Sequence, residues 1–194
     1  MRSYIDCVYC YLKQAVSSMK MAGIEDEKKM HEVIYELMDY VKTFDTNVTP
    51  AENSSKVLLK TYELIGIDDP YKEVKKQSND LALELYNVLK QKIEDSDDRL
   101  YDALKIAVAG NIIDLGISRS FDIHEALAHS MGTGFSIDHY ELFRKKLEEV
   151  QEVLFLGDNS GEIVFDKLLV EELTRLGKQV TYVVKGAPIL NDAT

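Results

Sequence analysis

Residues 152–186 read EVLFLGDNSGEIVFDKLLVEELTRLGKQVTYVVKG. A short apolar strand stops at Gly157, a helical segment follows and ends at Gly177, and a second strand rich in Val and Tyr comes next. A strand, a helix and a strand within about 35 residues form a βαβ unit, which predicts two parallel strands joined by a right-handed crossover. The unbroken apolar character of the first strand is typical of a parallel sheet.

The 150 residues before this unit predict helices almost throughout. Thr49, Pro50 and Glu52 form a helix-starting signature, and Gly66 ends the same helix. The helix after Pro70 is expected to bury Val74, Leu81, Leu85, Val88 and Leu89. The sequence therefore predicts an α/β protein in which a helical domain, residues 1–150, precedes the first βαβ unit of an α/β domain, residues 151–194.

Two parallel strands do not make a stable sheet alone, because both faces and both edges need cover. We therefore expect residues 151–194 to be the start of a longer, truncated α/β domain, or to receive further strands from another chain.

The chain of 194 residues carries a net charge of −11 with a pI of about 4.8. Such a charge argues against nucleic acid and against an anionic membrane surface as partners. No apolar run approaches the roughly 18 residues of a membrane span, and the first ten residues do not read as a signal peptide. A cytoplasmic location is the resulting expectation. The oligomeric state stays open.

Cys7 and Cys10 form a lone C-x-x-C pair. In a reducing compartment they are not expected to form a disulfide, and the second pair that a zinc site would need is absent. We expect two small residues on a helix, with a metal or redox role as the alternative.

Polar residues follow both strands of the βαβ unit. Asp158 and Asn159 come after the first strand, and Lys185 and Asp192 come after the second. Neighbouring parallel strands lie about 4.8 Å apart and end at the same edge of the sheet, where ligands of such sheets bind. Oxygen ligands of this kind suit Mg²⁺ or Mn²⁺ and a phosphorylated substrate. A helix cap at 158–160 and a turn at Asp192 are the structural alternatives.

The stretches GDNSGEIVFD and KGAPILNDAT together resemble the metal-dependent damage-control phosphatases. The matching positions are Asp158, Asn159, Gly161, Glu162, Asp166, Lys185, Pro188 and Asp192. A third motif of that family resembles GNIIDL, with Gly110, Asn111, Asp114 and Leu115. The N-terminal CVYC is similar to the stand-alone prokaryotic branch.

This resemblance implies a Rossmann-like core behind a helical bundle. It implies a divalent metal, Mn, Co, Ni or Mg, held by Asp158, Asn159 and Asp192, which would also be the catalytic residues. It implies hydrolysis of small phosphate monoesters, such as sugar phosphates or damaged metabolites. The residues that it assigns to the substrate or its phosphate are Asn111, Asp114, Gly161, Glu162 and Lys185. The family's sheet continues past the motif at Asp192, so the complete pocket is expected of a longer chain.

Two other functions compete with a phosphatase. A methyltransferase that uses S-adenosylmethionine also places an acid after its first strand, although it favours a glycine-rich turn there. A non-catalytic module that binds a metal or a phosphometabolite is the third candidate. Neither the physiological substrate nor the preferred metal follows from the sequence.

Overall fold

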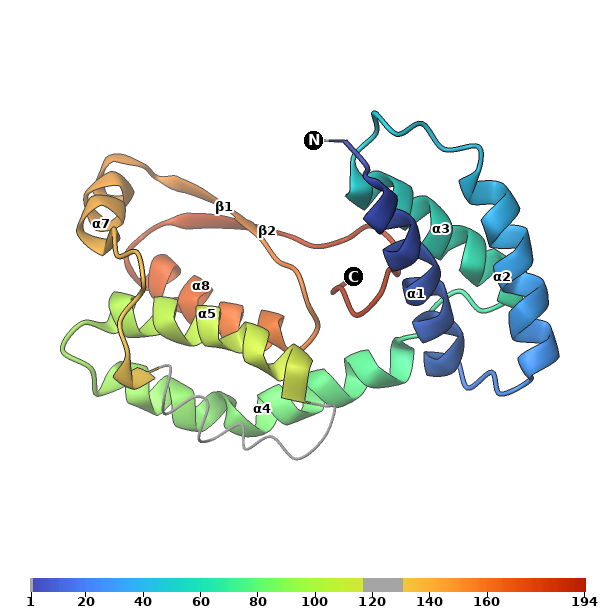
Figure 1. Cartoon of the computed structure of the whole chain (residues 1–194). Coiled ribbons are helices and arrows are strands. Elements are labelled where there is room, and N and C mark those ends of the chain that lie inside the picture. The colour runs from blue at the N-terminus through green and yellow to red at the C-terminus, as the bar shows by residue number, and fades with distance from the viewer. Residues whose placement is uncertain (1, 117–130) are drawn as a thin grey trace. The chain divides into compact units, whose positions relative to one another are not determined.

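The computed structural model describes the backbone of residues 2–116 and 131–194, and the side chains of residues 2–111 and 131–194 (Figure 1). The chain forms two compact units. The helical unit comprises the residues up to Val74 together with Ala187–Asn191. The sheet unit comprises Lys75–Gly186 and Asp192–Thr194.

The helical unit contains α1 (Ile5–Met21), α2 (Glu27–Val41) and α3 (Pro50–Ile65). The expected start of α3 is confirmed, because the Glu52 amide donates a hydrogen bond of 3.3 Å to the Thr49 hydroxyl. Gly66 ends α3 in the left-handed conformation with φ 71°, which glycine adopts without a steric penalty. The core of this unit is formed by Tyr11, Ala15, Met19, Met30, Val33, Leu37, Val57 and Ile65. Cys7 and Cys10 are free thiols on α1.

The sheet unit contains most of α4 (Lys72–Glu94), then α5 (Arg99–Gly116), α7 (Tyr140–Glu149), β1 (Glu152–Leu156), α8 (Glu162–Arg175) and β2 (Gln179–Val183). α5 and α8 lie along one another, and α8 also contacts β2 (Figure 1). Because of this packing, α4 and α5 share a compact unit with the strands. The boundary between the two compact units lies after Val74, and the expected helical domain of residues 1–150 stays a prediction.

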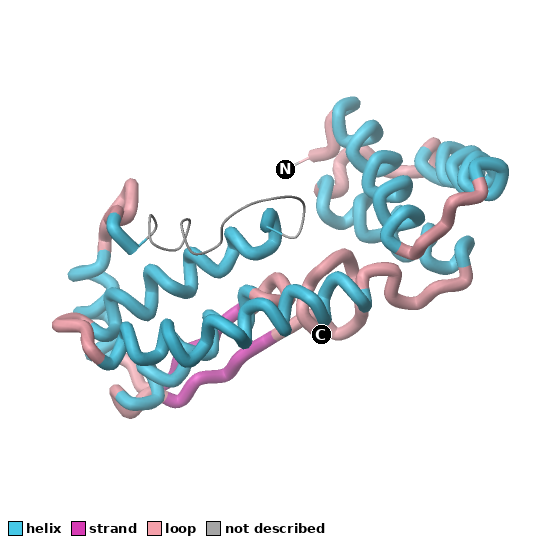
Figure 2. Tube along the Cα trace, turned by 90° about the horizontal axis from the view of Figure 1, so that it is seen from below, coloured by secondary structure: helices cyan, strands magenta, loops and turns pink. Residues whose placement is uncertain are grey.

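β1 and β2 are parallel neighbours, and their register pairs Glu152 with Gln179 and Leu156 with Val183 (Figure 2). The predicted βαβ unit and the α/β class are therefore confirmed. Val153 and Phe155 turn toward the helices and pack against the core, whereas Leu154, on the opposite face of β1, is 66% exposed.

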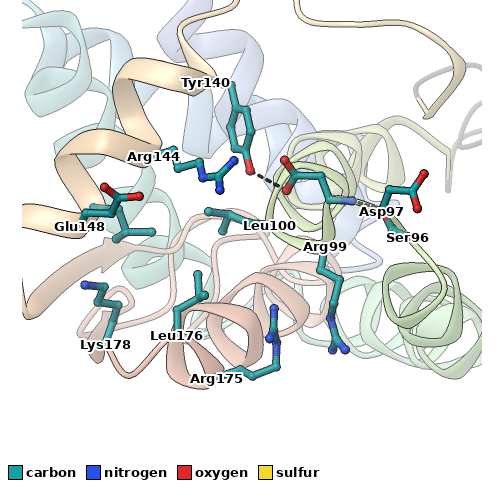
Figure 3. A pocket seen from close by; sticks show the side chains of 12 residues that line it. Ser96, Asp97, Arg99, Leu100, Tyr140, Arg144, Glu148, Arg175, Leu176 and Lys178 are labelled. Carbon is teal, nitrogen blue, oxygen red and sulfur yellow. Dashed lines mark hydrogen bonds between the residues drawn. The ribbon is translucent and has the colours of Figure 1, made fainter.

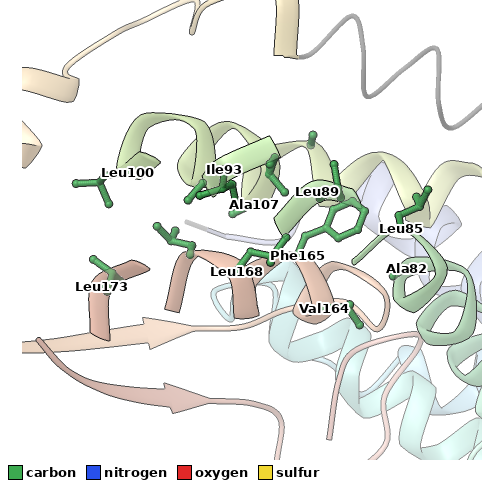
Figure 4. Close-up of a cluster of buried hydrophobic side chains, with 14 of the residues drawn as sticks. Ala82, Leu85, Leu89, Ile93, Leu100, Ala107, Val164, Phe165, Leu168 and Leu173 are labelled. Carbon is green, nitrogen blue, oxygen red and sulfur yellow. The ribbon is translucent and has the colours of Figure 1, made fainter. Parts of the chain in front are cut away.

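The core of the sheet unit lies between α4, α5 and α8, with the Phe165 ring fully buried near its centre (Figure 4). The face that α4 buries differs in part from the expected one. Leu85 and Leu89 are buried as predicted, but Val88 is 69% exposed. The buried line of α4 runs in steps of three and four through Lys75, Ser78, Ala82, Leu85, Leu89 and Ile93. Val88 precedes Leu89 by one residue and so points about 100° away from this line.

Among the described residues, no helix combines the length and the apolar character needed to cross a bilayer.

Candidate functional site

The ends of β1 and β2 bring together Asp158, Asn159, Lys185 and Asp192. The Gly157 amide donates to the Val183 carbonyl at 2.8 Å, which extends the parallel ladder by one step. The Asp158 carbonyl then accepts a hydrogen bond of 2.7 Å from the amide of Ala193. Asn159 and Asp192 form an isolated antiparallel bridge. The backbone thus fixes both acidic residues beside each other at the edge of the sheet.

The carboxylates of Asp158 and Asp192 face one cationic position. The Lys185 ammonium lies 3.7 Å from Asp158 Oδ1 and 3.3 Å from Asp192 Oδ2. The Asp192 side chain is 15% exposed, and that of Asp158 is 56% exposed. Burial raises the pKa of Asp192, the negative charge of Asp158 raises it further, and Lys185 opposes both effects. Two carboxylate oxygens that share one ammonium could also share a metal cation.

Asn159 supplies an amide next to this pair. Its side chain is buried, and its Nδ2 donates to Glu162 Oε2 at 3.3 Å. The amide nitrogen is therefore engaged by a carboxylate, and the carbonyl oxygen is the end of the group that could bind a cation. Two carboxylates and one amide oxygen suit a hard divalent ion that completes its shell with water and substrate oxygens. The residues implied for the metal, Asp158, Asn159 and Asp192, therefore fit one.

In the described part of the chain, no three His, Cys, Asp or Glu side chains gather closely enough to hold a metal. The candidate centre contains only two acids, Asp158 and Asp192, so a metal held there would also need the amide oxygen of Asn159.

The residues expected around the substrate lie on α5 and at the start of α8. Asn111, exposed on α5, donates from Nδ2 to Glu162 Oε2 at 3.3 Å. Burial raises the pKa of Glu162, and the neighbouring Asp166 raises it further. Gly161 has φ 86°, and its amide donates to Asn79 Oδ1 at 2.6 Å, so this N–H is directed at a side chain of α4. The side chain of Asp114 lies outside the described residues.

Two further residues of α4 support the site and were missed by the sequence analysis. Asn79 accepts the Gly161 hydrogen bond just described, and Lys75 lies close enough to Asp192 to lower its pKa. Lys75 is only 7% exposed. The sequence does carry a signal for its burial. Lys75 and Ser78 occupy the positions that extend the buried face of α4 toward the N-terminus of the helix. A lysine on a buried line is rare unless it meets an opposite charge.

A tyrosine on β2 explains why glycine precedes Asp158. The Tyr182 hydroxyl donates to Asp166 Oδ2 at 2.6 Å, and Asp166 is buried on α8. The Tyr182 ring stacks on Phe155 with 5.1 Å between the ring centroids. A Cβ at Gly157 would lie 2.6 Å from both Cε1 and Cζ of this ring. The loop can therefore pass over Tyr182 only without a side chain at position 157.

A separate cavity of about 400 Å³ lies at the opposite edge of the sheet, where Leu176 and Lys178 precede β2 (Figure 3). Side chains of both signs line it, among them Arg144 and Glu148. Its lining includes none of the predicted site residues.

Comparison with known proteins then tests the resemblance. Residues 3–194 match the family model of the damage-control phosphatase ARMT1-like domain. The chain belongs to this family. Among damage-control phosphatases, it is 30% identical over 193 residues to one from Archaeoglobus fulgidus, a match that covers 97% of this chain and 66% of the relative. It is also 28% identical over 196 residues to one from Pyrococcus horikoshii, with 100% of this chain and 67% of the relative covered.

An uncharacterized protein from Methanocaldococcus jannaschii is 29% identical over 195 residues, covering 97% of this chain and 64% of that protein. The chain thus spans about two thirds of the length of these relatives. The crystal structure of a DUF89 family protein from Pyrococcus horikoshii superimposes with a TM-score of 0.87 at 26% identity. That match covers 100% of this chain and 68% of the other, so the whole of this α/β chain shares the fold of a DUF89 family protein.

Proposed function

We propose that the site at the ends of β1 and β2 is the catalytic centre of a metal-dependent phosphatase. Its substrates are small phosphate monoesters, either sugar phosphates or damaged phosphometabolites. The observation that carries the proposal is the convergence of Asp158 and Asp192 on one cationic position, at 3.7 and 3.3 Å from Lys185 Nζ. Family membership supports phosphate chemistry at this position, since the named relatives are damage-control phosphatases.

Asp158, Asn159 and Asp192 would hold the metal, which is Mn²⁺, Co²⁺, Ni²⁺ or Mg²⁺. When bound, such a cation polarises a phosphoryl oxygen and lowers the pKa of a coordinated water. The protein's contribution is to hold the two carboxylates beside each other at the sheet edge. Lys75 assists by lowering the pKa of Asp192, against the effect of burial.

Lys185 binds the phosphate as a compact positive charge on a flexible stem. Its side chain is 47% exposed, so the ammonium is free to turn from the acids toward an arriving phosphate. Glu162 and Asn111 border the same site from α8 and α5. Asp114 follows Asn111 by three residues in the sequence of α5 and belongs to the proposed substrate residues, whereas the Gly161 N–H is engaged by Asn79.

Family membership favours this chemistry over methyl transfer. It does not by itself separate a catalyst from a module that binds metal and phosphometabolite without turnover. That distinction has to be made by assay, because the chain spans only part of its relatives' length.

The test is hydrolysis of p-nitrophenyl phosphate and of a sugar phosphate by the purified chain, with each of the four metals in turn. We expect metal-dependent turnover that falls at least about 100-fold in Asp158→Asn and Asp192→Asn, since each removes a ligand charge. Asp39→Asn, at an exposed ion pair on α2, is the matched control and should match the wild type. Calorimetry measures metal binding in parallel.

Saturable binding of metal and phosphate without turnover would favour the non-catalytic module. A chain that neither binds any of these metals nor hydrolyses either substrate would refute the proposal.

A further inference from the structure

We propose that Glu162 and Asn111 are positioning residues that orient the amide of Asn159 for the cation. The Glu162 carboxylate accepts one hydrogen bond from the side-chain amide of each asparagine. The Asn159 carbonyl oxygen is therefore turned away from that carboxylate. This inference rests on the proposed function, because it concerns how one of the proposed metal ligands is held.

The first step is the shared acceptor. Asn159 Nδ2 and Asn111 Nδ2 both donate to Glu162 Oε2, each at 3.3 Å. A carboxylate can only accept hydrogen bonds, so it selects the nitrogen end of any amide beside it. Without that selection, the amide of Asn159 could present either its oxygen or its nitrogen to the site, and only the oxygen binds a cation.

The second step is the close approach of α5 to Glu162, which the absence of a side chain at Gly110 permits. A Cβ at Gly110 would lie 3.3 Å from both Cα and Cγ of Glu162, and 3.2 Å from Cδ2 of Phe165. These distances are at the short limit of ordinary packing, so the missing side chain lets α5 approach the start of α8. That approach is what allows Asn111, the next residue, to reach the Glu162 carboxylate.

Gly110 and Asn111 therefore have complementary parts in one contact. The glycine provides the space and the asparagine provides the hydrogen bond. This gives the motif at 110–111 a function that direct substrate contact does not explain, since the Asn111 donor is already directed at Glu162.

The experiment measures Mn²⁺ affinity by calorimetry, inorganic phosphate affinity of the Mn²⁺-loaded protein, and the midpoint of thermal unfolding. Glu162→Ala should weaken Mn²⁺ binding about tenfold, the effect typical of removing a group that orients a metal ligand. Glu162→Gln should stay within about threefold of the wild type, because its carbonyl oxygen can still accept both amide hydrogens. Asn111→Ala and Gly110→Ala should each weaken Mn²⁺ binding by a few fold.

Gly132→Ala is the control for the glycine change, because a Cβ there meets no atom within 4 Å. It should bind Mn²⁺ as the wild type does. Asn111 is exposed, so its variant is expected to fold even if Gly110→Ala does not, and unchanged thermal midpoints separate orientation from stability.

Several outcomes would overturn the inference. Glu162→Gln as weak as Glu162→Ala would show that Glu162 acts through its charge. Asn111→Ala that lowers phosphate affinity alone would make Asn111 a substrate residue. Glu162→Ala with wild-type Mn²⁺ affinity would refute the positioning function and leave the proposed function standing. A wild-type chain that binds no metal would instead refute the proposed function.

Discussion

Replacing Gly157 by alanine should destabilise the sheet unit, because the loop after β1 passes directly over the Tyr182 ring. The added methyl group would lie 2.6 Å from Cε1 and Cζ of this ring, and closer still to its hydroxyl oxygen. Real carbon atoms do not approach so closely, so the ring must move. Phe155 stacks on one side of it, and Asp166 holds its hydroxyl at 2.6 Å.

The cost has two parts. Forcing an extra methyl group into a packed site costs about 1–3 kcal/mol. Moving the phenol away from Asp166 leaves a buried carboxyl group without its hydrogen bond, at a further cost of about 1–3 kcal/mol. The lower backbone entropy of unfolded alanine offsets about 0.4–1 kcal/mol of this. We therefore expect the free energy of unfolding to fall by about 2–4 kcal/mol.

Urea denaturation measures this change, and a double-mutant cycle tests its cause. In a Tyr182→Val background the ring is gone, and Gly157→Ala should then cost less than about 0.5 kcal/mol. Gly132→Ala serves as the control for a glycine that has open space around its Cα. The same cost for Gly157→Ala in both backgrounds would refute the proposed contact with the ring.

Two further predictions concern buried acids of α8. Glu172→Ala should lower the free energy of unfolding, measured by urea denaturation, by about 2 kcal/mol. Arg99 and Arg175 both bind this carboxylate, and the substitution leaves them without their partner. A loss below about 0.5 kcal/mol would contradict this prediction. Burial raises the pKa of Asp166 above its ordinary 3.8, and the hydrogen bond from Tyr182 opposes this effect. The folded protein therefore keeps a proton that the unfolded chain releases. The resulting contribution to stability is full below pH 3.8 and is lost as the pH rises through the raised pKa. Asp166→Asn should therefore gain stability relative to the wild type as the pH rises above about 4, and a constant difference between the two would contradict this.

Much of the sheet edge could be predicted from the sequence, because the relevant information is local. An apolar run followed by Gly157 and Asp158, then a helix and a second strand, fixes both the parallel pairing and the side on which polar residues emerge. The confirmed cap of α3 at Thr49 is equally local, since one side chain and one amide three residues later define it.

The contributions of Asn79 on α4 and Tyr182 on β2 could not be predicted in this way. Asn79 meets Gly161 across 82 positions of sequence, and no periodic pattern records such a contact. Tyr182 reads as an ordinary strand residue until the path of the loop at Gly157 is known. The inner face of α4 was misjudged at Val88 because apolar residues lie on two adjacent lines of that helix, and only packing against α5 and α8 selects one.

The position of Lys185 between Asp158 and Asp192 has a consequence for the order of assembly. Two acids held side by side repel each other, but here a lysine of the same chain offsets part of that repulsion. The scaffold can therefore form first and take up the proposed metal ion afterwards. A chelator should then abolish the proposed activity while leaving the fold intact, unlike the behaviour of small zinc domains, which unfold when their ion is withdrawn.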